Sequence, residues 1–478
     1  MKRLFIAAAS LCCMICAEAK IELPNILGSG MVLQHSADVN IWGKANPDSK
    51  VTVKTSWSKD KIVTRSDSEG KWSTVVATPK ASFTPLSLTI SDGEPLTLDN
   101  VLAGDVWICS GQSNMEMPLH GNTSQAIEGS LDCILKAATE SSKLRFFTVG
   151  RERSYNKELD NCSGQWECAS SKSVSDFSAV GYFFGRMIAD AVDIPIGLIA
   201  TDWGDTKVET WMPLDALKQC VTPEQFKAKH GNHWSKPSEL YCSMIAPIRN
   251  FKAKGFIWYQ GESNLGDIDH YDVMLAKMVE SWRKDWGDTD NSMPFYFVQI
   301  APFIYGGSRE IAYPLFVESQ LRAVDRIPNS GMAGTTDIGE EYSIHPGKKR
   351  EVGQRLAALA LAQTYGMEGF EPKMPRLESY EVKDGKMILK MSNAGRGMNP
   401  WTLVPLIGFE IAGADKVFHP AKAWTSDKPC DVITVWSDEV KQPVAVRYAF
   451  RNFIPANLTN TYGIPAAPFR TDDWNDVK

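Results

Sequence analysis

The sequence has no run of basic residues, and acidic side chains outnumber basic ones. It carries 51 Lys and Arg against 57 Asp and Glu, which gives a formal net charge of -6. Without a run of Lys and Arg to contact the phosphate backbone of DNA or RNA, we expect no nucleic-acid partner. The sequence also lacks internal repeats and low-complexity linkers, and only 7 of its 478 residues are histidine. After the N-terminal segment no apolar stretch approaches the roughly 20 residues that a membrane helix needs, so no membrane span is expected.

Cysteine is scarce and is not arranged for metal binding. Of the 10 cysteines, three fall in the first 16 residues, and the seven that remain form no CxxC pair with a matching histidine cluster. We therefore expect neither a structural zinc nor any other metal. An odd number implies at least one free thiol, and Cys162 and Cys168 are close enough in sequence to bridge a loop in an oxidising compartment.

The N-terminus has the pattern of a signal peptide. Lys2 and Arg3 precede an apolar stretch over residues 4–16, and Ala17-Glu18-Ala19 follows as a small-residue cleavage site. The pattern predicts that residues 1–19 are removed after Ala19. The mature protein is then expected to be secreted or periplasmic.

The rest of the chain divides into three regions with different sequence patterns. Residues 20–102 alternate short β-rich runs with turn residues, which suits a small β-sandwich. Residues 103–370 alternate apolar strands such as Gly255 to Tyr259 with helical stretches such as 271–286 and 352–365, as in a doubly wound parallel sheet. Short β patterns return in 371–478. The predicted fold is therefore α/β with flanking β regions.

A serine follows one of the predicted parallel strands directly. Residues 106–109 read as a strand, Gly111-Gln112-Ser113-Asn114 as a turn, and the next residues as the start of a helix. A serine at such a turn projects its hydroxyl at the carboxyl edge of the sheet, beside free helix N–H groups that can stabilise an anion. The alternative is a helix N-cap serine. Ser110 is a competing nucleophile, but it lies nearer the strand.

Three more polar segments also follow predicted strands. They are Thr201-Asp202-Trp203-Gly204-Asp205, Gln260-Gly261-Glu262-Ser263-Asn264 and Ile344-His345-Pro346. Each could be an ordinary polar turn. Since ligands bind at the carboxyl ends of parallel strands, the four segments together indicate one active site that contains a serine, a histidine and side-chain amides.

Together these segments closely resemble the sialate O-acetylesterases of the SGNH hydrolase superfamily. The resemblance extends to Met31-Val32-Leu33-Gln34 and Ile41-Trp42-Gly43 near the N-terminus, and to Val446-Arg447-Tyr448 and residues 465–472 near the C-terminus. It implies a flavodoxin-like SGNH hydrolase domain and deacetylation without a metal or organic cofactor. By the same resemblance Ser113 is the nucleophile, His345 the general base, and the oxyanion hole comes from the Ser113 N–H, the Gly204 region and Gln260 or Asn264.

Two positions depart from the family pattern. Where the family usually has a second glycine after Trp-Gly, this chain has Asp205. Where SGNH enzymes commonly have an Asp two or three residues before the histidine, it has Ser343 and Tyr342. Glu341, Glu340, Asp337 or a backbone carbonyl could orient His345 instead, and we favour Glu341 because it is the nearest of these acids in sequence.

The resemblance implies a serine esterase that hydrolyses O-acetyl esters of sialic acid, most simply 9-O-acetyl, through an acetyl-serine intermediate. Its expected partner is O-acetylated sialic acid or a sialoglycan, while the oligomeric state stays open. One alternative is an esterase for acetyl-xylan or another acetylated polysaccharide. Another, of a different class, is a carbohydrate-binding protein that keeps the fold but has lost catalysis.

Overall fold

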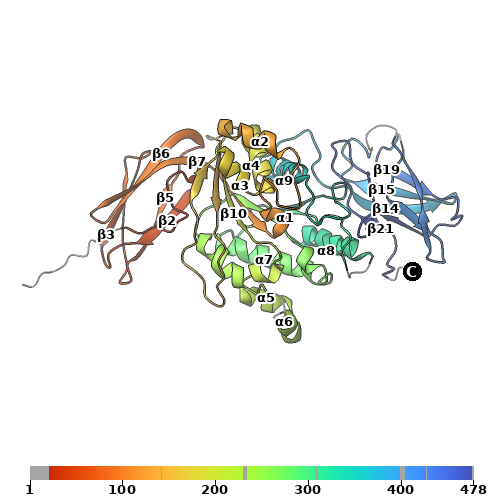
Figure 1. Ribbon diagram of the computed structural model, residues 1–478, viewed down its shortest axis with the longest axis horizontal. Helices are drawn as coiled ribbons and strands as arrows, with labels where there is room; N and C mark the ends of the chain where they lie inside the picture. The colour runs from red at the N-terminus through yellow and green to blue at the C-terminus, as the bar shows by residue number, and fades with distance from the viewer. Residues whose placement is uncertain are drawn as a thin grey trace, which may run out of the picture.

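Three regions follow one another along the long axis of the molecule in the computed structural model (Figure 1). β structure lies at the N-terminal end, mixed α/β structure in the middle and a second β region at the C-terminal end. The signal peptide predicted at residues 1–19 lies outside the described residues. No helix among the described residues is long and apolar enough to cross a membrane. The structure describes residues 21–140, 143–229, 234–306, 310–398, 404–426 and 428–475.

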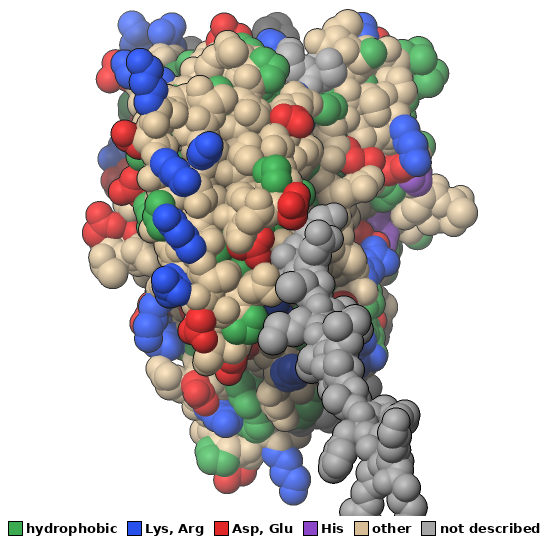
Figure 2. Space-filling view, turned by 90° about the vertical axis from the view of Figure 1, so that its left-hand side faces the viewer, with side chains coloured by type: hydrophobic (Ala, Val, Ile, Leu, Met, Phe, Trp, Pro, Cys, Tyr) green, Lys and Arg blue, Asp and Glu red, His purple; other side chains and the backbone are tan. Residues whose placement is uncertain are grey.

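The N-terminal region is built from short strands with alternating burial. In β2 (Asp38–Lys44), which pairs antiparallel with β5 (Lys71–Ala77), Val39 and Ile41 are buried and the residues next to them are exposed or half-buried. This alternation is typical of a sheet with one face on the core and one in water. Figure 2 shows that cationic and anionic side chains are interspersed on this end of the molecule. The other strands are β1 (Val32–Gln34), β3 (Lys50–Thr55), β4 (Lys61–Arg65) and β6 (Ser82–Ser91).

One long strand, β7 (Pro95–Gly111), joins the N-terminal region to the central one. Its first half pairs antiparallel with β6, and its second half pairs in parallel with β10 (Ile196–Asp202) and β11 (Gly255–Tyr259). Residues 101–111 are all buried, as expected for a strand covered on both faces. The boundary that the sequence predicts between residues 102 and 103 therefore falls inside a continuous strand.

The central sheet has the strand order β13-β12-β11-β7-β10-β8-β9, and every adjacent pair in it is parallel except β8 with β9. Helices cover both faces, with α4 and α9 on one and α7 and α8 on the other (Figure 1). Successive side chains of strand β11 pack into two different apolar clusters. Phe256 and Trp258 belong to one, and Ile257 and Tyr259 belong to the other. The predicted α/β class is confirmed. The other strands are β8 (Leu144–Thr148), β9 (Trp166–Cys168), β12 (Phe295–Val298) and β13 (Ser330–Ala333).

The helices predicted at 271–286 and 352–365 are observed as α7 (Tyr271–Asp285) and α9 (Lys349–Gln363). The other two that cover the sheet are α4 (Ala179–Val192) and α8 (Ala312–Arg326). Shorter helices are α1 (Ser113–Glu116), α2 (Ser130–Lys136), α3 (Ser171–Asp176), α5 (Leu214–Cys220) and α6 (Pro223–Lys229). Short 3-10 or π turns cover Ala137–Glu140, Val208–Trp211, Tyr241–Ile245, Ala246–Ile248 and Glu262–Asn264.

The strand order changes direction at β7. The chain runs outward to β8, returns to β10 beside β7, and then crosses to β11 on the other side of β7. Loops diverge at such a point, and ligands bind in the crevice between them. At Gly111 the backbone has φ +143°, and a Cβ atom there would lie 2.2 Å from the Tyr259 carbonyl oxygen. Only glycine fits this turn into the site.

The C-terminal region contains two four-stranded sheets, β14-β15-β19-β18 and β17-β16-β20-β21. They share one apolar cluster, to which the first sheet contributes Leu389 and Val435 and the second Ile411 and Val446. Flanking β structure is thus present at both ends, while its classification as β-sandwich stays a prediction. The strands are β14 (Arg376–Lys383), β15 (Lys386–Ser392), β16 (Phe409–Ala412), β17 (Phe418–Pro420), β18 (Lys422–Thr425), β19 (Val432–Trp436), β20 (Ala445–Tyr448) and β21 (Phe469–Arg470).

The disulfide considered between Cys162 and Cys168 is not formed in the structure. The thiol of Cys162 is buried, which raises its pKa to about 12, whereas Cys168 is exposed. Cys168 ends β9 and pairs with Arg145 of β8. Its position is therefore fixed by the sheet rather than by a bridge to Cys162.

Candidate active site

Ser113 begins helix α1 immediately after β7 and its turn. The Met115 and Glu116 backbone N–H groups both donate to the Gln112 carbonyl oxygen, which closes the first turn. Among the described residues, the N–H groups of Ser113 and Asn114 have no hydrogen-bond acceptor. Free N–H groups at a helix start can stabilise a developing negative charge. Ser113 thus has two backbone donors beside its hydroxyl.

His345 meets Ser113 from the far end of the α/β region. It lies in the loop between β13 and α9, and its Nε2 is 2.8 Å from the Ser113 Oγ. Burial lowers the pKa of His345, and the nearby charge of Lys349 lowers it further. A neutral imidazole at this distance can accept the hydroxyl proton. The structure thus brings together the two residues that the sequence predicts as nucleophile and base.

The structure does not bring Glu341 to His345. The Glu341 carboxylate accepts a hydrogen bond from the phenol of Tyr342, and this raises the pKa of Tyr342. Glu340 accepts from the Gly347 N–H at 2.8 Å, and Asp337 forms a two-point ion pair with Arg355 at 2.8 and 2.7 Å. Each acid considered as the orienting group has another partner. In the described part of the chain no carboxylate bonds the His345 ring, so the geometry is that of a Ser-His dyad.

Gly204 lies against Ser113, but its N–H is already in use. A Cβ atom at Gly204 would be 3.2 Å from the Ser113 Cβ, so the two residues are in contact. The Gly204 N–H donates to a carboxylate oxygen of Glu116, whose other oxygen pairs with Arg151. It could serve an oxyanion only by leaving Glu116. The sequence analysis missed Glu116, although its position three residues after Ser113 places it on the same short helix.

The Gln260 and Asn264 amides face the loop after β10 rather than Ser113. Both side chains are fully buried, and Gln260 donates to the Thr206 carbonyl at 2.9 Å and to Asn264 at 2.7 Å. Asn264 in turn donates to Glu209 at 2.8 Å and accepts from the Val208 N–H at 2.9 Å. Their donors are satisfied within the protein. The two amides therefore hold this loop in place and leave no free N–H for an oxyanion.

Asp205 has a backbone conformation that explains why the family usually has glycine at this position. Its φ is +53°, a left-handed value that glycine adopts freely and Asp tolerates better than most residues. Its carboxylate accepts from the Trp234 indole N–H at 2.9 Å. The Trp234 ring packs against Trp203 with a centroid distance of 5.2 Å. The acid is thus bound to the aromatic pair at the edge of the site.

Asn114 connects the two halves of the site. Its amide nitrogen donates to Glu262 at 2.6 Å and to the carbonyl of Ile344, the neighbour of His345, at 3.0 Å. Its amide oxygen accepts from Lys349. Sequence reasoning did not single out Asn114 or Lys349, because a polar residue after a nucleophile and a lysine in an amphipathic helix are both commonplace.

A second buried acid, Asp202, ends β10 beside Glu116. Burial, together with the charge of Glu116, raises the pKa of Asp202 from 3.8 to about 8, against an opposing effect of Arg151. One of its carboxyl oxygens is buried without a hydrogen-bond partner among the described residues. Asp202 is therefore protonated at neutral pH, which is costly for a group that ionises freely in the unfolded chain.

We expect Asp202→Asn to stabilise the fold increasingly as pH rises. Between pH 4 and 8 the folded chain keeps a proton that the unfolded chain releases, so wild-type stability falls through this window. The amide does not titrate, and its gain could reach about 4 kcal/mol near pH 7. Thermal unfolding at pH 5 and pH 8 measures it. Asp215→Asn, at a carboxylate that is 92% exposed, is the control. An equal gain at both pH values would contradict the expectation.

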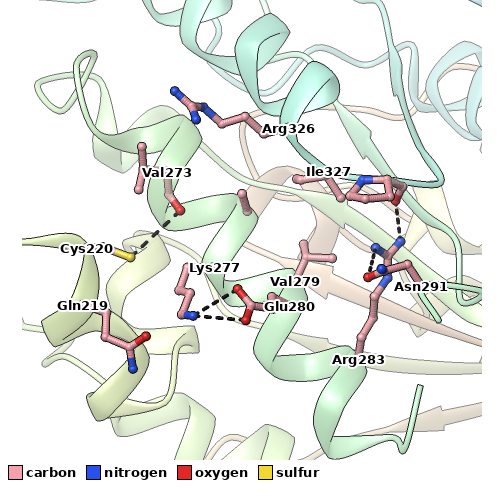
Figure 3. A pocket seen from close by; sticks show the side chains of 12 residues that line it. Gln219, Cys220, Val273, Lys277, Val279, Glu280, Arg283, Asn291, Arg326 and Ile327 are labelled. Carbon is pink, nitrogen blue, oxygen red and sulfur yellow. Dashed lines mark hydrogen bonds and ion pairs between the residues drawn. The ribbon is translucent and has the colours of Figure 1, made fainter. Parts of the chain in front are cut away.

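The cavity in Figure 3 lies outside this site. It has a volume of about 580 Å³ and lies between α5, α7 and the end of α8, with Cys220, Lys277 and Arg283 in its wall. None of the predicted site residues lines it.

Among the described residues no group of three or more His, Cys, Asp or Glu side chains could hold a metal ion.

Comparison with known proteins gives relatives for most of the chain. A family model described as carbohydrate esterase, sialic acid-specific acetylesterase, matches residues 103–362, which contain Ser113 and His345. The sialate O-acetylesterases of Pongo abelii and Homo sapiens are each 30% identical to this chain over 399 residues, covering 77% of it and 76% of their own length. That of Mus musculus is 29% identical over 423 residues, covering 76% of this chain and 77% of its own.

A solved structure is also similar over nearly the whole chain. It is a carbohydrate acetylesterase from Xanthomonas citri, with a TM-score of 0.84 and 33% sequence identity. The match covers 95% of this chain and all of the other. The likeness therefore includes the β regions at both ends as well as the α/β centre.

Proposed function

Because the chain belongs to the sialic acid-specific acetylesterases, a family of carbohydrate esterases, we propose that it hydrolyses O-acetyl esters of sialic acid, above all the 9-O-acetyl ester, through an acetyl-serine intermediate. Esterase activity on O-acetylated carbohydrates follows from the family itself. The observation that carries the proposal is the 2.8 Å contact between the Ser113 hydroxyl and the His345 Nε2. We further propose that the enzyme acts outside the cytoplasm, after cleavage near Ala19.

The first half of the reaction forms the acetyl-enzyme. His345 Nε2 takes the Ser113 proton as the Oγ attacks the acetyl carbonyl carbon, and the carbonyl electron pair moves onto oxygen. The free N–H groups of Ser113 and Asn114 stabilise this oxyanion. When the intermediate collapses, the C–O bond to the sugar breaks and the sugar oxygen takes the proton from His345. The deacetylated sugar leaves, and the acetyl group stays on Ser113.

The second half regenerates the enzyme. His345, neutral again, removes a proton from water, whose oxygen attacks the acetyl-serine carbonyl. Collapse of the second tetrahedral intermediate breaks the bond to the Ser113 Oγ, which recovers its proton from His345, and acetate leaves. The lowered pKa of His345 supports both steps, because the ring remains a proton acceptor in mildly acidic solution.

The substrate is tested by comparing kcat/KM for 9-O-acetyl sialic acid with that for acetylated xylo-oligosaccharides. We expect a preference of at least about tenfold for the sialic acid ester, or about 1.4 kcal/mol of differential transition-state stabilisation. The xylan alternative is kept because the Xanthomonas citri enzyme, 33% identical over nearly the whole chain, is described only as a carbohydrate acetylesterase. A preference for the xylo-oligosaccharide would replace the proposed substrate and leave the serine mechanism in place.

The alternative of a binding protein without catalysis is not retained. Membership of an esterase family argues against it, and so does a serine hydroxyl in hydrogen-bond contact with a neutral histidine. The absence of an acid beside His345 is compatible with a Ser-His dyad, so it does not imply a loss of catalysis.

A further inference from the structure

A buried lysine reaches Asn114, the residue that follows Ser113. Lys349 is the first residue of α9, and its side chain is fully buried. Burying an ammonium group is costly unless something compensates it. Burial lowers the pKa of Lys349 to about 7, and the charges of Glu262 and Glu340 oppose this effect, although neither carboxylate is in ion-pair contact with the lysine. Its hydrogen bond goes instead to the neutral amide oxygen of Asn114, and its Nζ lies 5.6 Å from the centroid of the Tyr259 ring.

The partner of this lysine is the residue that joins both halves of the site. Asn114 follows Ser113 in α1, and its amide nitrogen holds the carbonyl of Ile344, the residue before His345, at 3.0 Å. The same nitrogen donates to the buried Glu262 at 2.6 Å. Because the amide can point its oxygen at Lys349 only while its nitrogen points at Ile344 and Glu262, the lysine and these two acceptors together fix which way the amide faces.

The charges around His345 come from several elements. Lys349 faces it from α9, Glu262 lies behind Asn114 in the loop after β11, and Glu340 and Glu341 belong to the loop of His345 itself. Glu116 on α1 is paired with Arg151. Of these groups, Lys349 is the one whose charge acts on the His345 ring, and it disfavours the protonated form. A triad aspartate would act in the opposite sense, since it stabilises the imidazolium.

We propose that Lys349 is a positioning residue of the esterase site, which orients Asn114 between the Ser113 helix and the His345 loop. The inference rests on the proposed function, since it assumes that Ser113 and His345 perform the reaction. It assigns to a buried cation and an amide the orienting work that an acid performs in a triad. The substrate need not touch Lys349.

The test is the pH profile of kcat/KM for 4-nitrophenyl acetate in the Lys349→Met protein, whose side chain has similar length and no charge. We expect kcat to fall by about 10- to 100-fold, because the amide loses its fixed orientation, with little change in KM. We also expect the acid limb to move up by about one pH unit, because removing a nearby positive charge raises the pKa of His345. Lys348→Met removes the adjacent lysine and should match wild type in both respects.

Lys349→Arg separates charge from geometry and serves if Lys349→Met does not fold. It should keep the acid limb at the wild-type pH while lowering kcat, because the guanidinium retains the charge but not the shape. A wild-type kcat and acid limb in Lys349→Met would overturn the proposal, and so would an equal upward shift of the limb in Lys349→Arg. Failure of the proposed function is distinguishable from either outcome, because it would appear as undiminished activity when Ser113 itself is replaced.

Discussion

Replacing Ser113 with alanine is expected to lower kcat/KM for 4-nitrophenyl acetate by about 10⁴-fold or more, because no acetyl-enzyme can form without the hydroxyl. The remaining rate would come from the free N–H groups at the start of α1 and from substrate binding. The fold should be intact, since the Ser113 hydroxyl bonds His345 and its loss removes no core packing. Initial rates measured beside a thermal unfolding curve test both statements.

Ser110 supplies the matched control. It lies three residues earlier, near the end of β7, is fully buried, and its hydroxyl has no hydrogen-bond partner among the described residues. Ser110→Ala should retain wild-type activity, and a fluorophosphonate should label the wild-type protein at Ser113 but leave Ser113→Ala unlabelled. Undiminished turnover in Ser113→Ala would remove Ser113 as nucleophile. Loss of turnover in Ser110→Ala alone would transfer the role to the earlier serine.

The largest expected loss of stability comes from Arg447→Met in the C-terminal region. Arg447 and Asp472 form an ion pair at 2.6 Å, and their side chains are only 2% and 1% exposed. The guanidinium also donates to the Trp474 carbonyl and lies 4.3 Å from the centroid of the Phe418 ring. Removing one partner of such a pair leaves a buried charge uncompensated, which typically costs about 3–5 kcal/mol. The midpoint of urea unfolding, followed by tryptophan fluorescence, measures the loss.

An exposed pair in the same region is the control. Lys422 and Asp438 are 2.7 Å apart but 63% and 75% exposed, so Lys422→Ala should cost about 1 kcal/mol or less. If both variants shifted the midpoint equally, burial would not be what makes the Arg447 pair important.

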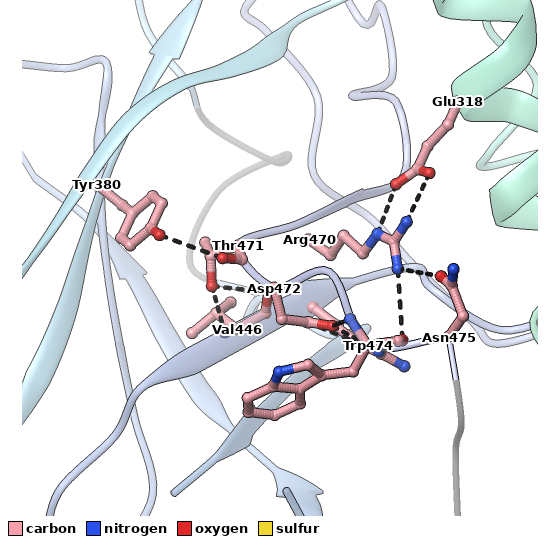
Figure 4. Close-up of polar contacts among 9 residues, drawn as sticks. Glu318, Tyr380, Val446, Arg470, Thr471, Asp472, Trp474 and Asn475 are labelled. Carbon is pink, nitrogen blue, oxygen red and sulfur yellow. Dashed lines mark hydrogen bonds and ion pairs between the residues drawn. The ribbon is translucent and has the colours of Figure 1, made fainter. Parts of the chain in front are cut away.

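The neighbouring Arg470–Glu318 pair, at 2.7 Å, ties this end of the chain to α8 (Figure 4). The buried Arg447–Asp472 ion pair joins two segments noted in the sequence for their family resemblance, Val446-Arg447-Tyr448 and Thr471-Asp472.

The position of the site could be predicted from the sequence because it depends on strand ends. Ser113, Gly204, Gln260 and His345 each follow a parallel strand, and parallel strands bring such residues to one edge. The pattern cannot tell which way a side chain turns once it is there. Gln260 and Asn264 have the donors that an oxyanion needs, but the loop after β10 uses them.

Sequence distance did not reveal whether an acid lies beside His345. Glu341 is the nearest of the acids considered, yet its carboxylate bonds Tyr342, while Glu340 bonds the Gly347 N–H. Loop direction, which composition does not encode, decides these partners. Lys349 was missed for a related reason. Helical periodicity indicates which face is buried, but not that a lysine on it will reach a polar partner on another helix.

Strand β7 also bears on how the protein comes apart. Its first half is held by β6 and its second by β10 and β11, so the N-terminal region and the sheet that carries Ser113 share one backbone segment without a hinge. Loss of the N-terminal pairing would remove the β6 partner from the strand that leads to Ser113. We therefore expect the two regions to unfold together, and a cut at residue 103 would fall inside β7 rather than between two separate units.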